Sequence, residues 1–256
     1  MKFETPGEDL SSEEKFKLAK EKHPDPRSFS DKIKHNIQEV EPIQNWLKDR
    51  AELMVERSGI NDALEDFKDR DSIKIADIGG GSQHIENEII KSNPDKNIST
   101  VGIDLSDYAS DKISGSEAGK KINSIFGKGE QLSIKDKSVE VASSYFTFQE
   151  LNDEEQEKVL DEMIRIIEDD GKIIIVDEPS RGESGESIVA RAKNIFRNAK
   201  VSDYNLHNAQ DWRNIFEEKG LKIVAKKEFR EDGKEVDEEN PAQFFSYVLE
   251  KTEKKM

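Results

Sequence analysis

The residues best suited to chemistry form one short run, Asp-Ile-Gly-Gly-Gly, at positions 77–81. An apolar stretch from Ile73 leads into this run, and a helical pattern follows it from Ile85 to Ser92. Glycines let the backbone turn sharply and approach a bound molecule closely. The first turn of a following helix offers unpaired N–H groups. The order of strand, acid, glycine loop and helix therefore predicts a ligand site at the end of a strand.

A second acid, Asp104, ends the next apolar stretch, 25 residues after Gly79. In doubly wound folds an acid at about this distance accepts hydrogen bonds from a ribose diol. The sequence does not match the dinucleotide-binding pattern G-x-G-x-x-G, because His84 occupies the third glycine position. The sequence does not match the pattern of a phosphate-binding loop either, because Gly119-Lys120 is followed by Lys121 rather than by Ser or Thr.

The glycine segment resembles the first motif of the class I S-adenosylmethionine-dependent methyltransferases, D-x-G-x-G-x-G. Asp77, Gly79 and Gly81 match it, while Gln83 stands at the third glycine position. Residues 100–106 resemble the second motif of the same family.

Two later blocks are similar to that family as well. Residues 127–146 resemble its loop and fourth strand, and Leu160–Val176 resembles the helix, turn and fifth strand. Together the resemblance covers about residues 70–180 and implies S-adenosylmethionine as the cofactor.

The resemblance also implies a role for each matching residue. Asp77, with the backbone of Gly79, Gly80 and Gly81, would hold the methionine end of the cofactor. Asp104 would hold the ribose, Leu105 would pack on the adenine, and Glu130 and Gln131 would cover the adenine. Ser144 and Tyr145 would lie near the methyl group and its acceptor. Many members have an acid that accepts from the adenine amine where this chain has Lys128, which cannot accept.

Several polar residues are candidates for the acceptor side, each with a structural alternative. Glu178 ends the fifth strand, Gln149 and Glu150 follow the fourth, and His207 could act as a base. Each could equally be a solvated or packing residue of a loop. Methyl transfer from a sulfonium mainly requires alignment, so the catalytic residues are left unknown.

The elements that would position these residues alternate along the chain. Apolar strands are expected at 73–78, 99–105, 139–145, 172–177, 221–229 and 243–251, and helices at 43–54, around 64–67, and at 85–92, 154–168, 186–200 and 211–219. This order predicts an α/β fold with a doubly wound, mostly parallel Rossmann-like sheet, an antiparallel final strand and a helical N-terminal extension.

We divide the chain into a helical extension or lid, residues 1–70, and a cofactor-binding methyltransferase domain, residues 71–256, with an insertion at about 182–210. The lid and the insertion are expected to wall the acceptor site, with Trp46 in the lid. On this division, a chain truncated before Asp69 would still bind the cofactor but would no longer transfer methyl groups.

Composition narrows the function further. The 256 residues carry a formal net charge of −16, which disfavours nucleic acid as a partner without excluding it. The chain has no cysteine, which excludes disulfides and thiolate zinc sites, and its four histidines lack metal-ligand spacing, so no metal is expected. With no apolar run of transmembrane length, we expect a cytoplasmic protein that does not span a membrane.

A small-molecule acceptor is the leading hypothesis, followed by protein or RNA, and the oligomeric state stays open. Two other readings compete with a methyltransferase enzyme. One is a non-catalytic subunit that keeps the fold and acts as a partner protein, which Lys128 and Gln83 would suit. The other is a different nucleotide-using enzyme on the same fold.

Overall fold

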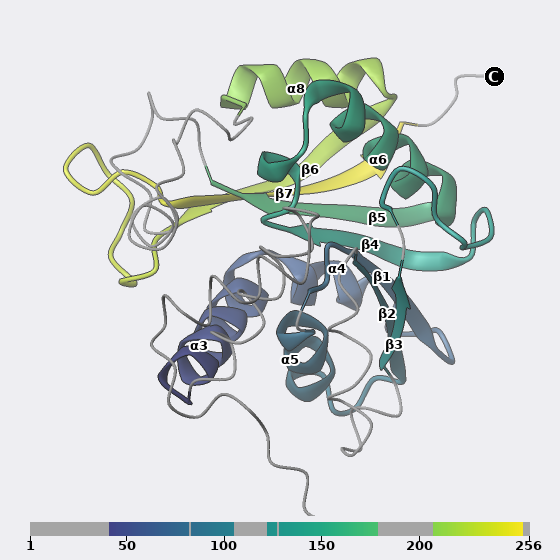
Figure 1. Cartoon of the computed structure of the whole chain (residues 1–256), viewed down its shortest axis with the longest axis horizontal. Coiled ribbons are helices and arrows are strands. Elements are labelled where there is room, and N and C mark those ends of the chain that lie inside the picture. The colour runs from purple at the N-terminus through teal and green to yellow at the C-terminus, as the bar shows by residue number, and fades with distance from the viewer. Residues whose placement is uncertain (1–40, 82, 105–121, 127, 179–206, 253–256) are drawn as a thin grey trace, which may run out of the picture. The chain divides into compact units, whose positions relative to one another are not determined.

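The structure is a computed structural model that describes residues 41–81, 83–104, 122–126, 128–178 and 207–252 (Figure 1). The chain divides into two units, 1–47 and 48–256. The sheet and its packing, described below, belong to the second unit.

One seven-stranded sheet forms the centre of this unit, in the order β3-β2-β1-β4-β5-β7-β6. The strands are β1 Ile73–Ile78, β2 Ile98–Asp104, β3 Ile122–Phe126, β4 Val139–Tyr145, β5 Ile167–Asp177, β6 Leu221–Phe229 and β7 Phe244–Lys251. The pairs from β3 to β5 are all parallel, whereas β7 runs antiparallel to both of its neighbours. The predicted fold class, including its antiparallel final strand, is confirmed.

Helices cover both faces of the sheet. They are α3 Glu41–Arg57, α4 Ile60–Glu65, α5 His84–Ser92, the short 3₁₀ helix η3 Phe148–Glu150, α6 Asp153–Ile166 and α8 Ala209–Glu218. Figure 1 shows α6 and α8 on one face, with α4 and α5 on the other. Each face has its own apolar core: one joins α6 and α8 to the sheet, and the other joins α4, α5 and the second half of α3 to it.

Capping residues explain where α6 and α8 begin. Asn152 and Asn208 each accept from the backbone of the first helical turn, and Glu155 and Asp211 bond back to the capping residue. Such capping boxes satisfy N–H groups that have no partner within the helix. At the other end of α8, Gly220 has a φ of +71°, as expected for the glycine that ends a helix.

The segment just before β1 is part of the second core. Met54, Ile60, Leu64 and Phe67 are at most 2% exposed and pack in the same apolar cluster as β1 residue Ile75. The helices predicted at 43–54 and near residue 64 are therefore present. In the described part of the chain no helix is long and apolar enough to cross a membrane.

The structure corrects two strand predictions. β3 was not predicted; it pairs only with β2 at one edge of the sheet. β5 begins at Ile167 rather than at Lys172, because Ile167 already pairs with Val139 before the chain bulges. The predicted helix at 186–200, most of the predicted insertion and the N-terminal arm, residues 1–40, lie outside the described residues.

Candidate cofactor and acceptor site

The glycine loop follows β1 at the edge where the parallel strands end. Gly79 has a φ of +83°, and a Cβ there would lie 1.9 Å from Oγ1 of Thr147. Gly81 has a φ of +48°, and nothing lies closer than 3.7 Å to the position of its Cβ. Gly79 thus permits close packing against the chain after β4, whereas Gly81 leaves open space above the loop.

Gln83 explains how the chain departs from the three-glycine motif. Its φ is +58°, in the left-handed region, and its side chain is 2% exposed. Glycine adopts this conformation without strain, whereas another residue costs about 1–2 kcal/mol there. The loop therefore keeps the backbone path that the missing glycine would favour.

Asp77 lies beneath the loop rather than on its surface. Its side chain is 1% exposed, and Oδ1 accepts a hydrogen bond of 2.6 Å from Ser143 of β4. Burial, together with the nearby negative charge of Asp104, raises the pKa of Asp77 to about 7, although the hydrogen bond from Ser143 opposes the shift. Asp77 is thus poised between its two protonation states near neutral pH.

Asp104 ends β2 beside the same loop. One of its carboxylate oxygens, Oδ2, accepts from the backbone N–H of Gly81 at 2.9 Å, and its side chain is only half-buried. The contact brings together the two motifs that were predicted to bind one ligand. Its role toward a ribose stays a prediction.

The two predicted site residues at the end of β4 have side chains engaged inside the protein. Ser144 Oγ donates to the carbonyl oxygen of Ile78 at 3.0 Å. The hydroxyl of Tyr145 lies 3.2 Å from that of Ser58, and the ring is 6% exposed. Ser144 therefore ties β4 to β1, and Tyr145 ties it to the turn between α3 and α4.

The loop predicted to cover the adenine lies next to β1. A Cβ on Gly129 would lie 2.9 Å from Cγ2 of Ile78, so this loop packs closely on the end of that strand. Glu130 is half-buried and Gln131 is exposed. Leu105 lies outside the described residues, and the adenine contacts stay predictions.

Two buried acids lie at the end of β5, Asp177 as its last residue and Glu178 as the next. Asp177 is 2% exposed and accepts from the backbone N–H groups of Gln149 and Glu178, each at 3.0 Å. Burial raises its pKa well above the ordinary value. Glu178 is 4% exposed and lies 3.9 Å from Arg50 of α3. The backbone after β4 is thus fixed to the end of β5 through Asp177.

Aromatic rings surround the Arg50 guanidinium. Its Cζ lies 4.3 Å from the ring centre of Phe146 and 5.0 Å from that of Phe244. Phe146 follows β4 with a φ of +60°, a strained conformation that is often found at functional sites. Arg50, Phe146, Phe244 and Glu178 form what we term the acceptor cluster.

His207 and Trp212 have structural roles on the other face. Nε2 of His207 lies 2.5 Å from Oε1 of Gln156, and its ring meets Trp212 edge-on at 5.1 Å. Trp212 is 2% exposed and stacks on Phe216. For Trp46, the structure describes the backbone but not the side chain.

Four site residues were missed by sequence reasoning: Ser143, Thr147, Arg50 and Glu86. Two of them had a detectable signal. Arg50 follows Trp46 by four residues and precedes Met54 by four, so it lies on an apolar helical face. Glu86 precedes Ile89 by three residues in the same way. A charge on such a face predicts a buried ionisable group.

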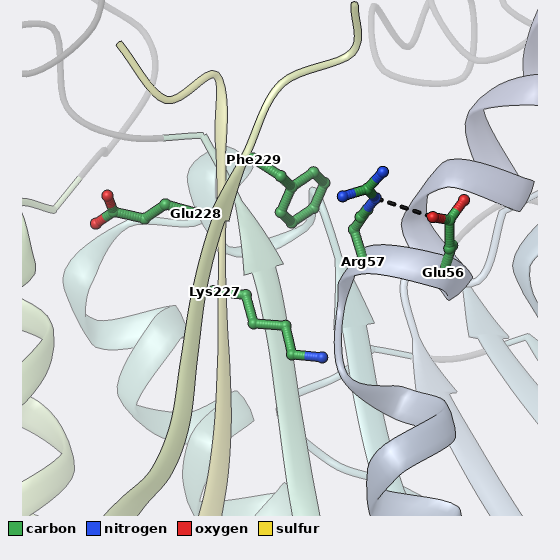
Figure 2. A pocket seen from close by; sticks show the side chains of 5 residues that line it. All are labelled: Glu56, Arg57, Lys227, Glu228 and Phe229. Atoms are coloured by element: carbon green, nitrogen blue, oxygen red, sulfur yellow. Dashed lines mark ion pairs between the residues drawn. The ribbon is translucent and has the colours of Figure 1, made fainter. Parts of the chain in front are cut away.

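A separate pocket of about 430 Å³ lies near the end of β6, lined by Glu56, Arg57, Lys227, Glu228 and Phe229 (Figure 2). Figure 2 shows Arg57 directed toward Glu56, and their ion pair measures 3.1 Å. Three strands separate β6 from β1, so this pocket is not the predicted cofactor site.

Known proteins similar to this chain share its fold. A SAM-dependent methyltransferase from Aquifex aeolicus is 18% identical with a TM-score of 0.54, over 77% of this chain and 91% of that one. The mitomycin 7-O-methyltransferase MmcR is 10% identical with a TM-score of 0.61, over 93% and 60% of the two chains. A methyltransferase from Haloferax volcanii, in complex with the Trm112 methyltransferase activator, is 14% identical with a TM-score of 0.56, over 83% and 97%.

A search of curated proteins gives no match. The sequence model of the methyltransferase domain family matches residues 76–175, which extend from the glycine loop to the end of β5. Residues 76–175 are thus similar in sequence to the methyltransferase domain family, and the solved structures share the fold of the chain.

Proposed function

We propose that this chain binds S-adenosylmethionine over the glycine loop and transfers its methyl group to an N, O or C nucleophile of a small molecule. The observation that carries this proposal is the 2.9 Å bond between Gly81 of the first motif and Asp104 of the second. It places an open glycine backbone and a partly exposed carboxylate side by side, as a ligand with a ribose requires.

The residues present fit this cofactor. The space above Gly81 is open, whereas Gly79 and Gly80 are too crowded beneath the loop for any side chain. The cofactor supplies an activated methyl group on a sulfonium, so the protein contributes mainly position and orientation. Asp104 would hold the ribose hydroxyls, and the backbone of the loop would support the methionine end.

The acceptor would lie beside the acceptor cluster, at the carboxyl ends of β4 and β5. In open α/β sheets ligands bind outside the carboxyl ends of the strands. Phe146 is only half-buried and can offer apolar surface, and the buried Arg50 and Glu178 beside it supply a few polar groups. This mixture is typical of small-molecule pockets, and the net charge of −16 disfavours RNA.

Calorimetry gives the first test of the cofactor. We expect S-adenosylmethionine and S-adenosylhomocysteine to bind, and NAD not to bind, because His84 replaces the third glycine of a dinucleotide loop. Binding of NAD without S-adenosylhomocysteine would refute the proposal. Incubation with labelled cofactor and a cell extract, fractionated into small molecules, protein and RNA, then shows which class of acceptor gains the label. A protein that binds cofactor but labels nothing would support the non-catalytic alternative.

Asp104→Ala is expected to weaken cofactor binding while the fold is retained. Each lost charge-assisted hydrogen bond to the ribose should cost about 1.5–3 kcal/mol, so Kd should rise roughly tenfold to a hundredfold. Asp95→Ala removes one negative charge from an exposed site near β2 and is the control for net charge. If Asp104→Ala binds S-adenosylhomocysteine within twofold of the wild type, Asp104 does not hold the ribose.

A further inference from the structure

Glu86 of α5 is a buried acid that the proposed reaction does not use. Its side chain is fully buried, and neither carboxyl oxygen has a hydrogen-bond partner among the described residues. Oε1 lies 2.5 Å from the place of a Cβ on Gly80 and 2.6 Å from that on Gly102. The carboxyl group therefore occupies space that only two glycines leave open, directly beneath the cofactor loop.

Asp77 points to the same place from β1. Its Oδ2 lies 3.4 Å from the Cβ position of Gly80, and Glu86 Oε1 lies 2.5 Å from the same position. The charges that act most strongly on Glu86 are those of Asp77 and Asp104, and both are negative. Tyr145 of β4 faces both carboxyls, and its own pKa is raised by burial and by their charge.

Among the residues that the structure describes, no positively charged group acts strongly on this pair. Burial, and then the charge of Lys48, lowers the pKa of His84, which disfavours a positive charge on this side chain. The described residues contain no group of three side chains arranged to hold a metal ion. A buried carboxyl pair of this kind does not ionise fully near neutral pH, because each negative charge disfavours the other. Burial and the charge of Asp77 raise the pKa of Glu86 well above its ordinary value.

We propose that Asp77 and Glu86 hold one proton between them beneath the glycine loop and release it when a cationic cofactor binds. This inference rests on the proposed cofactor. S-adenosylmethionine carries a sulfonium, an ammonium and a carboxylate, so its net charge is positive, whereas the product has lost the sulfonium charge. The ionised pair attracts the first more than the second, and the site therefore selects substrate cofactor over product.

Calorimetry in two buffers with different ionisation enthalpies measures the protons released on binding. At pH 6.5, where the ammonium groups of both ligands are charged, we expect about half to one proton released with S-adenosylmethionine and close to none with S-adenosylhomocysteine. By linkage, the affinity for S-adenosylmethionine should rise about threefold to tenfold between pH 6 and pH 7. The affinity for S-adenosylhomocysteine should change less than about twofold over the same range.

Glu86→Gln keeps the size of the side chain and removes the shared proton. We expect it to abolish both the proton release and the rise in affinity. Glu88→Gln, on the same helix but paired with Lys91 outside this cluster, should leave both unchanged.

A third measurement needs no cofactor. Since the folded pKa of the pair is raised, the pair favours folding at low pH, and this contribution is lost as pH rises from about 4 through about 7. Glu86→Gln should therefore flatten the fall of Tm across that window.

The outcomes separate the inference from the proposed function. If neither ligand binds, the proposed function fails. If both bind but the wild type releases equal numbers of protons with the two, the inference is wrong, whether or not the variant folds. Retained proton release in folded Glu86→Gln would also overturn it, because the proton would then come from another group.

Discussion

Alanine at position 79 is expected to destroy the cofactor site. Its Cβ would overlap the Thr147 side chain at 1.9 Å, and its φ of +83° belongs to the region that favours glycine. Thr147 cannot simply rotate away without cost, because its Oγ1 donates to the carbonyl oxygens of Ile78 and Tyr145. Backbone strain of about 1–2 kcal/mol and overpacking of about 1–3 kcal/mol together predict a loss of roughly 2–5 kcal/mol in the free energy of unfolding.

Cofactor affinity should fall by about thirtyfold or more, because about 2 kcal/mol of loop distortion, the lower end of that range, corresponds to this factor. Urea unfolding measures the stability, and calorimetry with S-adenosylhomocysteine measures the affinity.

Gly233→Ala is the matched control for this substitution. Gly233 has a φ of +70°, yet nothing lies within 4 Å of its Cβ position. Gly233→Ala should therefore lose only the free energy of unfolding that backbone strain costs, and it should bind the cofactor with wild-type affinity. Combining Gly79→Ala with Thr147→Gly should recover part of the lost stability, because the clashing side chain is gone. Wild-type cofactor affinity in folded Gly79→Ala would contradict the assignment of this loop.

Local patterns were enough to predict the glycine loop and the two acids near the ends of β1 and β2. The glycine loop and the two acids are contiguous signals, each set by its own strand and turn. A parallel sheet then brings Asp77 and Asp104 to one edge, because neighbouring parallel strands end at the same side. The contact between Asp104 and Gly81 follows from this rule, although its distance did not.

Contacts that depend on tertiary packing were not predictable in the same way. Nothing in the order Phe146-Thr147-Phe148 indicates that Thr147 supports Gly79 across the sheet edge. Tyr145 was placed correctly at the end of β4, but alternation along a strand does not tell which face holds the ligand. Its hydroxyl meets Ser58, 87 residues earlier in the chain.

The edge strand β3 shows another limit. It has five residues, Ile122–Phe126, and only one partner strand. Short edge strands need less apolar sequence than buried ones, so their pattern is weak. By contrast, β4 is buried along its whole length, and β5 is buried from Gly171 onward and carries an apolar run at Ile173–Val176.

Truncation before Asp69 is expected to unfold the protein, contrary to the expectation from sequence that such a chain would bind the cofactor. It removes five side chains that are at most 2% exposed, namely Met54, Val55, Ile60, Leu64 and Phe67. Burial of such a side chain contributes about 1.5–3 kcal/mol, so the loss is roughly 10 kcal/mol. That is comparable with the whole stability of a typical domain, about 5–15 kcal/mol. The cut also uncovers Ile75 and Ile174 on the sheet.

A chain that begins at Glu41 is the matched comparison, because it keeps all of α3 and every residue of that core. It should stay folded, with Tm within about 5 °C of the full chain, and should bind S-adenosylhomocysteine as the full chain does. Circular dichroism and thermal unfolding of both truncations measure the difference. A folded, cofactor-binding chain that begins at Asp69 would show that the α3–α4 segment is not part of the core. If the chain that begins at Glu41 binds cofactor but no longer transfers methyl groups, residues 1–40 belong to the acceptor site, as the lid hypothesis proposes.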